Sequence, residues 1–304
     1  MPAVTHLAAL AGVLAITFSP IFVRLSGLSP ATVAFWRLAY ALPAVLGVWL
    51  IGRRRDLRPA RARVQAFAAG LFLAADLFTW HHSIGRIGAG AATLVGATQV
   101  VFVGFIAWAL YRERASRLAF VVLPVVLGGV ALLSGLGSAD AYGADPVAGV
   151  LFGLLSALCY SLFLVVLRHS NRGHLAPSAG PLLDATLGAL AGTGLTALLD
   201  SGFSLTPSWP AHGWVLALAL LCHAAGWLLI TGALPRLPAL EVSVLLLVQP
   251  VGAVVWAQLI FTERLSLVQW AGVAVVLGGI LALSLWGAAH RPATSEAPLS
   301  QPLA

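Results

Sequence analysis

The chain has 304 residues, of which 60% are hydrophobic and 9% are charged, with a mean hydropathy of +0.96. These values exclude an ordinary soluble domain. The formal net charge of +7 could indicate nucleic-acid binding, but every basic residue other than histidine is an arginine, and these arginines gather in short links between apolar segments. We therefore expect no nucleic-acid partner.

Ten apolar segments follow one another along the chain. Each is long enough, at about 1.5 Å per residue, to cross roughly 30 Å of hydrocarbon. The short links leave no room for a soluble domain, so the sequence predicts an all-α polytopic membrane protein in a lipid bilayer. The expected helices lie near residues 5–25, 30–52, 64–85, 88–111, 117–136, 146–168, 178–200, 212–234, 238–261 and 267–287.

Arginines mark the expected topology of these helices. Six of them fall between residues 53 and 63, and the links after the fourth, sixth and eighth segments carry more. The links on the other side hold Asp140, Asp145 and Asp200. The positive-inside rule therefore predicts that both termini are cytoplasmic.

A short motif is repeated 150 residues apart, since ERAS at 113–116 recurs as ERLS at 263–266. At the same offset VVLGG at 125–129 recurs at 275–279, and Gln99 falls on Gln249. Five helices per copy is an odd number, so the second copy enters the membrane from the opposite side. The sequence therefore predicts ten transmembrane helices arranged as two inverted five-helix repeats, an arrangement typical of transporters.

The repeat also divides the chain. We expect a first repeat at 1–136, an inter-repeat loop at 137–145, a second repeat at 146–287 and a disordered cytoplasmic tail at 288–304. Arg37 and Asp184 follow Pro30 and Pro177 at equal spacing. Inversion places these two charges near opposite faces of the membrane, so we do not expect them to pair.

Two charged residues lie inside the predicted hydrocarbon region, where each needs a partner or a water-filled cavity. Counted along the helices, Arg37 lies roughly 10 Å and Asp76 roughly 12–14 Å from the outer surface. Two interpretations remain open for this pair. The side chains form an ion pair that fixes packing, or they jointly face a cavity and bind substrate.

Other polar and aromatic residues fall near the same depth. Trp80 shares a helix face with Asp76, and Trp227 shares one with His223, since each pair is four residues apart. Gln99 and Gln249 occupy equivalent places in the repeat near the middle of the membrane. Aromatic walls with few polar anchors are typical of a small-molecule site. His223 either belongs to this site or is a hydrogen-bonded core residue, as a lone buried histidine more often is.

Three further residues are candidates for proton coupling or gating, beside Asp76 itself. His81 and His82 lie near the outer end of the third helix, where they either anchor the helix at the interface or form a proton-sensitive gate. Glu241 begins the ninth helix. Its carboxylate either stabilises the positive helix N-terminus or takes part in ion coupling.

Catalytic motifs are not found in the sequence. It contains no nucleophile–base arrangement, no Gly-rich phosphate loop and no spaced Cys/His metal motif, so we expect neither an enzyme nor a cofactor or metal. The alternative is an intramembrane enzyme that acts on a lipid-linked substrate through His81, His82 and Asp76. The repeated ERxS motif is expected to be structural, with Ser116 or Ser266 accepting hydrogen bonds from the next helix.

Several of these motifs together resemble the drug/metabolite transporter superfamily, in its EamA-type ten-helix branch. The resemblance covers residues 5–287 and rests on YRERAS and FTERLS, on VVLGG in each repeat, on AFWRLAY around Arg37 and on LLLVQPVGAVVW around Pro250. It implies a bacterial inner-membrane carrier, often an exporter of amino acids, nucleosides or other metabolites, that works by alternating access. It also implies a central cavity in the region of Arg37, Gln99 and Gln249.

The chain departs from the family pattern at two places. Val100 stands where the second repeat has Pro250, and Asp76, His81 and His82 make the third helix more polar. These differences favour a zwitterion or another polar metabolite. We therefore expect a secondary transporter that exports a small polar or amphipathic metabolite by alternating access, the metabolite being an amino-acid-like solute, a nucleoside or an amine. Monomer and homodimer both remain open.

Overall fold

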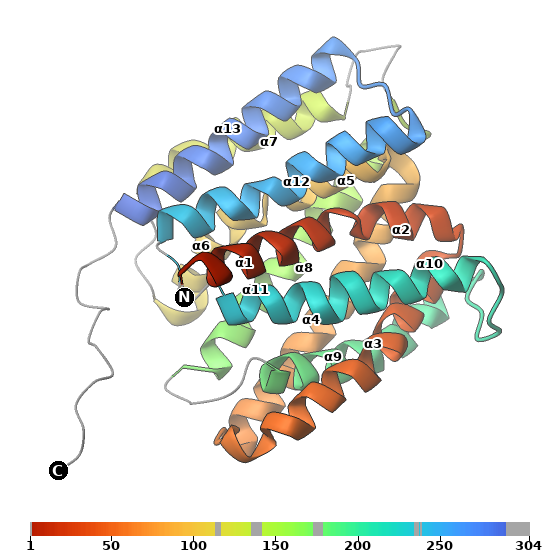
Figure 1. The fold of residues 1–304 in the computed structure, drawn as a ribbon. Helices are drawn as coiled ribbons and strands as arrows, with labels where there is room; N and C mark the ends of the chain where they lie inside the picture. Colours follow the sequence, from red (N-terminus) through yellow and green to blue (C-terminus); the bar gives the residue numbers. More distant parts are fainter. Residues whose placement is uncertain are drawn as a thin grey trace.

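The computed structural model describes residues 2–112, 117–134, 142–172, 179–233, 237 and 239–289. These residues form helices and the links between them (Figure 1). The start of α1 and the end of α13 lie at one end of the bundle, which we call the terminal end. The opposite end, called the far end, holds the links α2–α3, α4–α5, α9–α10 and α12–α13.

The helical order agrees with the ten expected segments. Eight of the described helical spans are long and apolar enough to cross a membrane, and two shorter apolar helices, Leu118–Leu133 and Leu245–Phe261, bring the number to ten. In chain order the elements are α1 (Pro2–Thr17), α2 (Ser19–Ser26), α3 (Pro30–Gly52), η1 (Arg53–Arg55), α4 (Ala60–Ile87), α5 (Ala89–Gly96), α6 (Gln99–Tyr111), α7 (Arg117–Leu133), α8 (Pro146–Ser170), α9 (Ala179–Thr196), η2 (Ala197–Leu199), α10 (Ala211–Ala217), η3 (Leu218–Gly226), α11 (Trp227–Ala233), α12 (Ala239–Phe261) and α13 (Leu267–Ala289).

Three spans that the sequence predicts as single helices are divided. The first breaks at Phe18, because Pro20 at the start of α2 has no N–H to continue the ladder of α1. The fourth breaks between α5 and α6, where the Thr98 hydroxyl bonds the carbonyl of Val95 at 2.7 Å and competes with the backbone. In the eighth, η3 is a nine-residue π-helix that carries His223. Such widened turns often occur at functional sites.

Glycines allow the repeats to pack closely against each other. A Cβ on Gly129 of α7 would lie 2.9 Å from Val275 and Val276, and one on Gly279 of α13 would meet Val126. The two copies of VVLGG therefore pack on each other across the molecule. Gly188 of α9 packs in a similar way against the backbone of Phe67 in α4.

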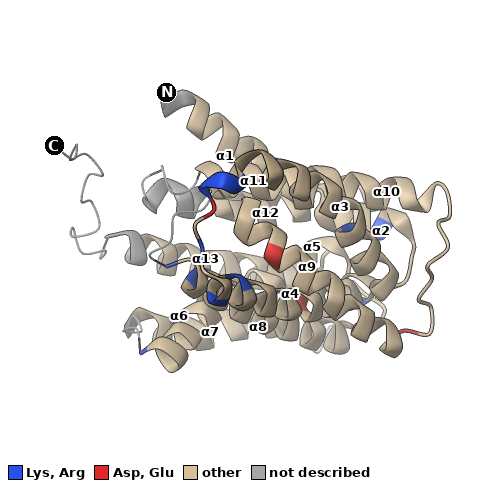
Figure 2. Ribbon diagram, turned by 90° about the horizontal axis from the view of Figure 1, so that it is seen from below, with Lys and Arg blue, Asp and Glu red and all other residues tan. Residues whose placement is uncertain are grey.

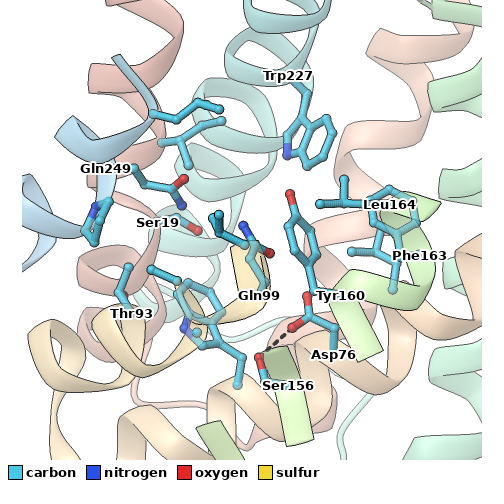
Figure 3. A pocket seen from close by; sticks show the side chains of 18 of the residues that line it. Ser19, Asp76, Thr93, Gln99, Ser156, Tyr160, Phe163, Leu164, Trp227 and Gln249 are labelled. Atoms are coloured by element: carbon cyan, nitrogen blue, oxygen red, sulfur yellow. Dashed lines mark hydrogen bonds between the residues drawn. The ribbon is translucent and has the colours of Figure 1, made fainter. Parts of the chain in front are cut away.

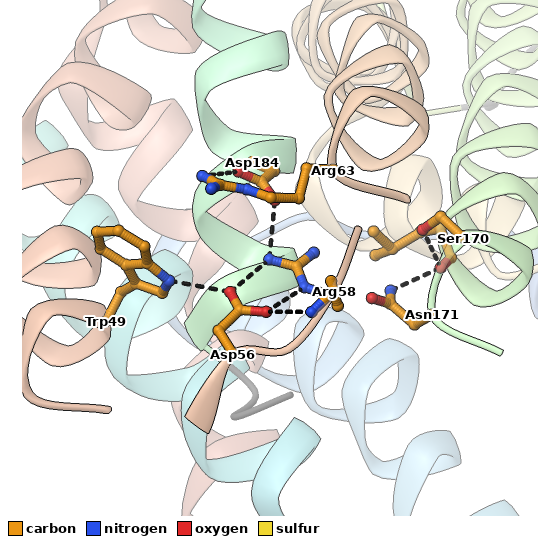
Figure 4. Close-up of polar contacts among 8 residues, drawn as sticks. Trp49, Asp56, Arg58, Arg63, Ser170, Asn171 and Asp184 are labelled. Atoms are coloured by element: carbon orange, nitrogen blue, oxygen red, sulfur yellow. Dashed lines mark hydrogen bonds and ion pairs between the residues drawn. The ribbon is translucent and has the colours of Figure 1, made fainter. Parts of the chain in front are cut away.

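A charged cluster ties three elements together at the terminal end (Figure 4). Arg58 contacts Asp184 at 2.8 Å and Asp56 at 2.8 Å, and Arg63 contacts Asp184 at 3.2 Å. The hydrogen bond from Arg58 is the main reason that the pKa of Asp56 falls to about 2. Asp184 therefore pairs with arginines at its own end of the bundle and not with Arg37, as the inverted repeat requires.

The charge distribution follows the same division into two ends. Figure 2 shows most of the arginines gathered at the end of the bundle that holds the N-terminus.

At the far end the second ERxS motif makes a reciprocal cap. Gln269 N–H donates to Ser266 Oγ at 3.2 Å, and Ser266 N–H donates to Gln269 Oε1 at 3.0 Å. The capping expected of Ser266 is thus present, while Ser116 lies outside the described residues.

Candidate functional site

A cavity of about 580 Å³ lies between the two repeats. Its size is in the range of small-molecule sites. Figure 3 shows side chains from helices of both repeats around it. The structure brings all seven residues expected to bind substrate into the wall of this single cavity: Arg37, Asp76, Trp80, Gln99, His223, Trp227 and Gln249.

Asp76 projects from the middle of α4 and is only 8% exposed. The Ser156 hydroxyl of α8 donates a hydrogen bond of 2.6 Å to its Oδ1 (Figure 3). A buried carboxylate needs such donors because it has lost its hydration. Arg37, Ser156 and Tyr160 line the same cavity as Asp76.

Arg37 comes from α3 and is 5% exposed. Among the residues that the structure describes, no carboxylate lies within 4.0 Å of its guanidinium group. Its buried Nε and Nη1 have no hydrogen-bond partner. Arg37 and Asp76 thus form no direct ion pair in this structure, and both belong to the cavity wall. An unpaired guanidinium is costly inside a membrane protein, and it suits a ligand with a negative group.

The two glutamines sit where their helices are irregular. Gln99 is the first residue of α6, directly after the break, and Gln249 precedes Pro250 within α12. Because proline has no N–H, the carbonyl of Leu246 loses its usual helical partner. Leu246 also lines the cavity. The glutamine side chains give the cavity neutral hydrogen-bonding groups (Figure 3).

Aromatic rings line the side of the cavity next to Asp76. The ring centroids of Tyr160 and Trp227 are 6.2 Å apart at 71°, and those of Phe163 and Trp227 are 5.9 Å apart at 68°. Such edge-to-face contacts hold the rings in place and leave other faces for a ligand. The sequence reasoning missed Tyr160 and Ser156. The signal that could have found them is a pair of hydroxyl groups four residues apart in the middle of an apolar helix.

His223 lies in the cavity wall but already has a partner. Its Nε2 is 3.1 Å from the Thr186 hydroxyl, and the residue is 2% exposed. Both interpretations of His223 are therefore compatible with its position.

The two histidines among the gating candidates have their contacts away from the cavity. His81 Nδ1 is 3.0 Å from the carbonyl of Pro30, and its Nε2 has no partner. His82 stacks on Phe152 and lies 3.1 Å from Arg86. Neither histidine is among the residues that line the cavity. The side chain of Glu241 lies outside the described residues.

Metal ligands do not gather anywhere in the described part of the chain, where no three His, Cys, Asp or Glu side chains come together. The cavity offers hydrogen bonds, opposite charges and aromatic faces, so its chemistry is that of binding.

Comparison with known proteins agrees with this architecture. The EamA-like transporter family matches the chain twice, at residues 4–135 and 147–285. The chain belongs to this family. It is therefore a multi-pass membrane transporter built from two copies of the family's unit.

Two similar proteins come from bacteria. The chain is 32% identical to "Uncharacterized protein PA1977" of Pseudomonas aeruginosa over 236 residues, which are 78% of each chain. It is 25% identical to "Uncharacterized transporter YwfM" of Bacillus subtilis over 69% of this chain and 68% of that one. A solved crystal structure shares the fold with a TM-score of 0.63 and 17% identity, covering 96% of this chain and 100% of its own.

Proposed function

We propose that the protein is a secondary transporter that moves a small polar or amphipathic metabolite across the bacterial inner membrane by alternating access. The solute is an amino acid or a similar zwitterion in the first place, and nucleosides and amines are the other classes to test. Both termini lie in the cytoplasm, as the arginines at the terminal end indicate, and transport is outward, as in many members of the family.

The observation that carries this proposal is the cavity between the repeats. Arg37 offers a guanidinium group whose Nε and Nη1 have no hydrogen-bond partner. Asp76 offers a carboxylate that accepts one hydrogen bond, from Ser156, among the residues that the structure describes. These groups suit the carboxylate and the ammonium group of a zwitterion. Trp80 and Trp227 suit its apolar part. A site at the interface of inverted repeats is the usual position for a solute in alternating access.

Coupling follows from the same residues. A ligand shifts a transporter between two states only through different affinities for them. Asp76 is the candidate for proton uptake because it is the acidic residue in the cavity wall. His81, His82 and Glu241 remain candidates for gating.

A counterflow screen in proteoliposomes tests the proposal. Liposomes loaded with unlabelled amino acids, nucleosides or amines are diluted into traces of the labelled pools, and accumulation identifies the class that exchanges. We expect the amino-acid pool to accumulate with the parent protein and with Arg264→Gln, an exposed arginine used as the control. We expect Arg37→Gln to reduce accumulation by about tenfold or more, since a hydrogen bond to a charged group contributes about 1.5–3 kcal/mol. If no pool accumulates above empty liposomes, the proposal is wrong.

A further inference from the structure

An ion pair joins the two repeats at the far end of the bundle. Arg24 of α2, in the first repeat, contacts Glu263 in the link between α12 and α13 of the second. The Arg24 guanidinium lies 4.2 Å from the ring centroid of Phe261 and donates to the Tyr142 hydroxyl at 3.0 Å. Glu263 is only 2% exposed, whereas the side chain of Arg24 is 33% exposed.

The same carboxylate caps a helix of the first repeat. Glu263 Oε1 accepts from Ala89 N–H at 2.9 Å, and Oε2 accepts from Gly90 N–H at 3.3 Å. These are free amides at the N-terminus of α5, where the helix dipole favours a negative group. Gly88 precedes them with φ 86°, and a Cβ there would lie 2.7 Å from the carboxylate. Only glycine leaves room for the cap. Glu263 therefore holds α2, α5 and its own link together.

These contacts lie one helical turn from the cavity. Thr93, four residues after Ala89 on α5, lines the cavity and donates to the Ala89 carbonyl at 2.8 Å. Ser19, which also lines the cavity, begins α2, the helix that carries Arg24. Movement of α2 or α5 away from Glu263 therefore moves the cavity wall directly.

The cavity approaches the two ends of the bundle differently. Toward the terminal end its wall includes Leu182, three residues from the start of α9, and Thr231, two residues from the end of α11. Toward the far end its wall stops at Arg37 on α3 and Trp80 on α4, each seven residues from the helix end, and at Thr93 on α5, four residues from the helix start. At about 1.5 Å per residue, roughly 6–10 Å of packed helix covers it there.

We propose that Arg24 and Glu263 form the gate that closes the far end of the cavity, and that their separation opens this end to the water on that side of the membrane. The inference rests on the proposed function for its role in transport, but the gate itself is tested without any solute. Arg24 already reaches the surface, so separation hydrates both charges and leaves neither stranded in the protein. Loss of the pair shifts the population toward the state that is open at the far end.

A purely structural role for Glu263, as the cap of α5, makes a different prediction. Arg24 takes no part in that cap. Arg24→Gln removes the ion pair between the repeats and leaves the two amide hydrogen bonds in place. Arg24→Gln therefore separates the gate from the cap, whereas Glu263→Gln affects both.

Cysteine labelling measures the opening. Cys159 and Cys222 are replaced by alanine, and Ser19→Cys is introduced as the reporter. Ser19 suits this purpose because it is 2% exposed, lines the cavity and has a hydroxyl without a hydrogen-bond partner. Thr262→Cys, at an exposed position of the α12–α13 link, shows which side of the membrane the far end faces. Labelling uses a membrane-impermeant maleimide on vesicles of both orientations.

We expect Arg24→Gln to raise the labelling rate of the reporter from the far side at least tenfold, and Arg24→Lys, which keeps the charge, to raise it less. Arg264→Gln, the neighbouring exposed arginine, should leave the rate unchanged. Equal rates in Arg24→Gln and the parent would overturn the gate. If the gate variants label faster but no solute shows counterflow, the gate stands and the proposed transport function is wrong. If Glu263→Gln fails to fold, the labelling rate of Arg24→Gln alone decides whether the ion pair is a gate.

Discussion

Replacement of Arg37 by methionine should make the protein more stable and stop transport. Arg37 is 5% exposed, and its buried Nε and Nη1 have no hydrogen-bond partner. Each buried polar group without a partner costs about 1–3 kcal/mol. Methionine is of similar length, adapts its shape and carries no charge. Because two such atoms are left without a partner, we expect Arg37→Met to raise the free energy of unfolding by about 2–4 kcal/mol.

The assay is thermal unfolding in detergent, followed through the intrinsic tryptophan fluorescence. A gain of this size corresponds to a rise of several degrees in Tm for a chain of this length. Arg264→Gln serves as the control and should change stability by less than about 0.5 kcal/mol, as exposed substitutions usually do. A lower Tm for Arg37→Met, or transport at the parent rate, would refute the inference that Arg37 binds the ligand and lowers the free energy of unfolding.

Three further predictions follow from other parts of the structure. Asp76→Asn, which keeps an acceptor for Ser156, should make the counterflow rate independent of pH; a parent-like pH profile would exclude proton coupling through Asp76. Gly188→Ala should destabilise the protein by about 3 kcal/mol or more, because its Cβ would overlap the α4 backbone. The control Gly194→Ala, on the same helix, meets nothing within 4 Å and should be neutral or slightly stabilising. Equal Tm values for the two variants would contradict this packing. The pKa of Asp56 in the folded state is lowered to about 2 from 3.8. Its contribution to the free energy of unfolding, about 1–2 kcal/mol, should therefore be complete above pH 4 and be lost as the pH falls toward 2. If Asp56→Asn leaves the dependence of stability on pH unchanged over this interval, the prediction is wrong.

The sequence predicted those features that depend on periodicity and on membrane depth. Apolar length gave the helices, and the family match to both halves confirms the repeat. Depth counting placed Arg37 and Asp76 at one level, and the shared offset paired Gln99 with Gln249; all four line one cavity. These features depend on one property of the fold. A helix in a membrane has a fixed rise, so residue number converts directly into depth.

Residues whose role depends on how helices are rotated against each other were missed. Ser156 reaches Asp76 only because α8 turns that face toward α4, and no pattern in either helix gives this angle. Glu263 belongs to the ERxS motif, for which the sequence predicted only a local structural role at the start of the next helix. Its carboxylate instead caps α5, 174 residues away, and binds Arg24. Contacts of this range follow from tertiary packing and not from local spacing.

The central claim is that a solute with a negative group binds to Arg37 in the cavity between the repeats. Its most direct test is equilibrium binding of the radiolabelled solute found by counterflow to the purified protein in detergent, with Arg264→Gln as the control. We expect Arg37→Gln to weaken binding by roughly 10- to 150-fold, equivalent to about 1.5–3 kcal/mol, and Arg264→Gln to bind like the parent. Equal affinities for Arg37→Gln and Arg264→Gln would contradict it.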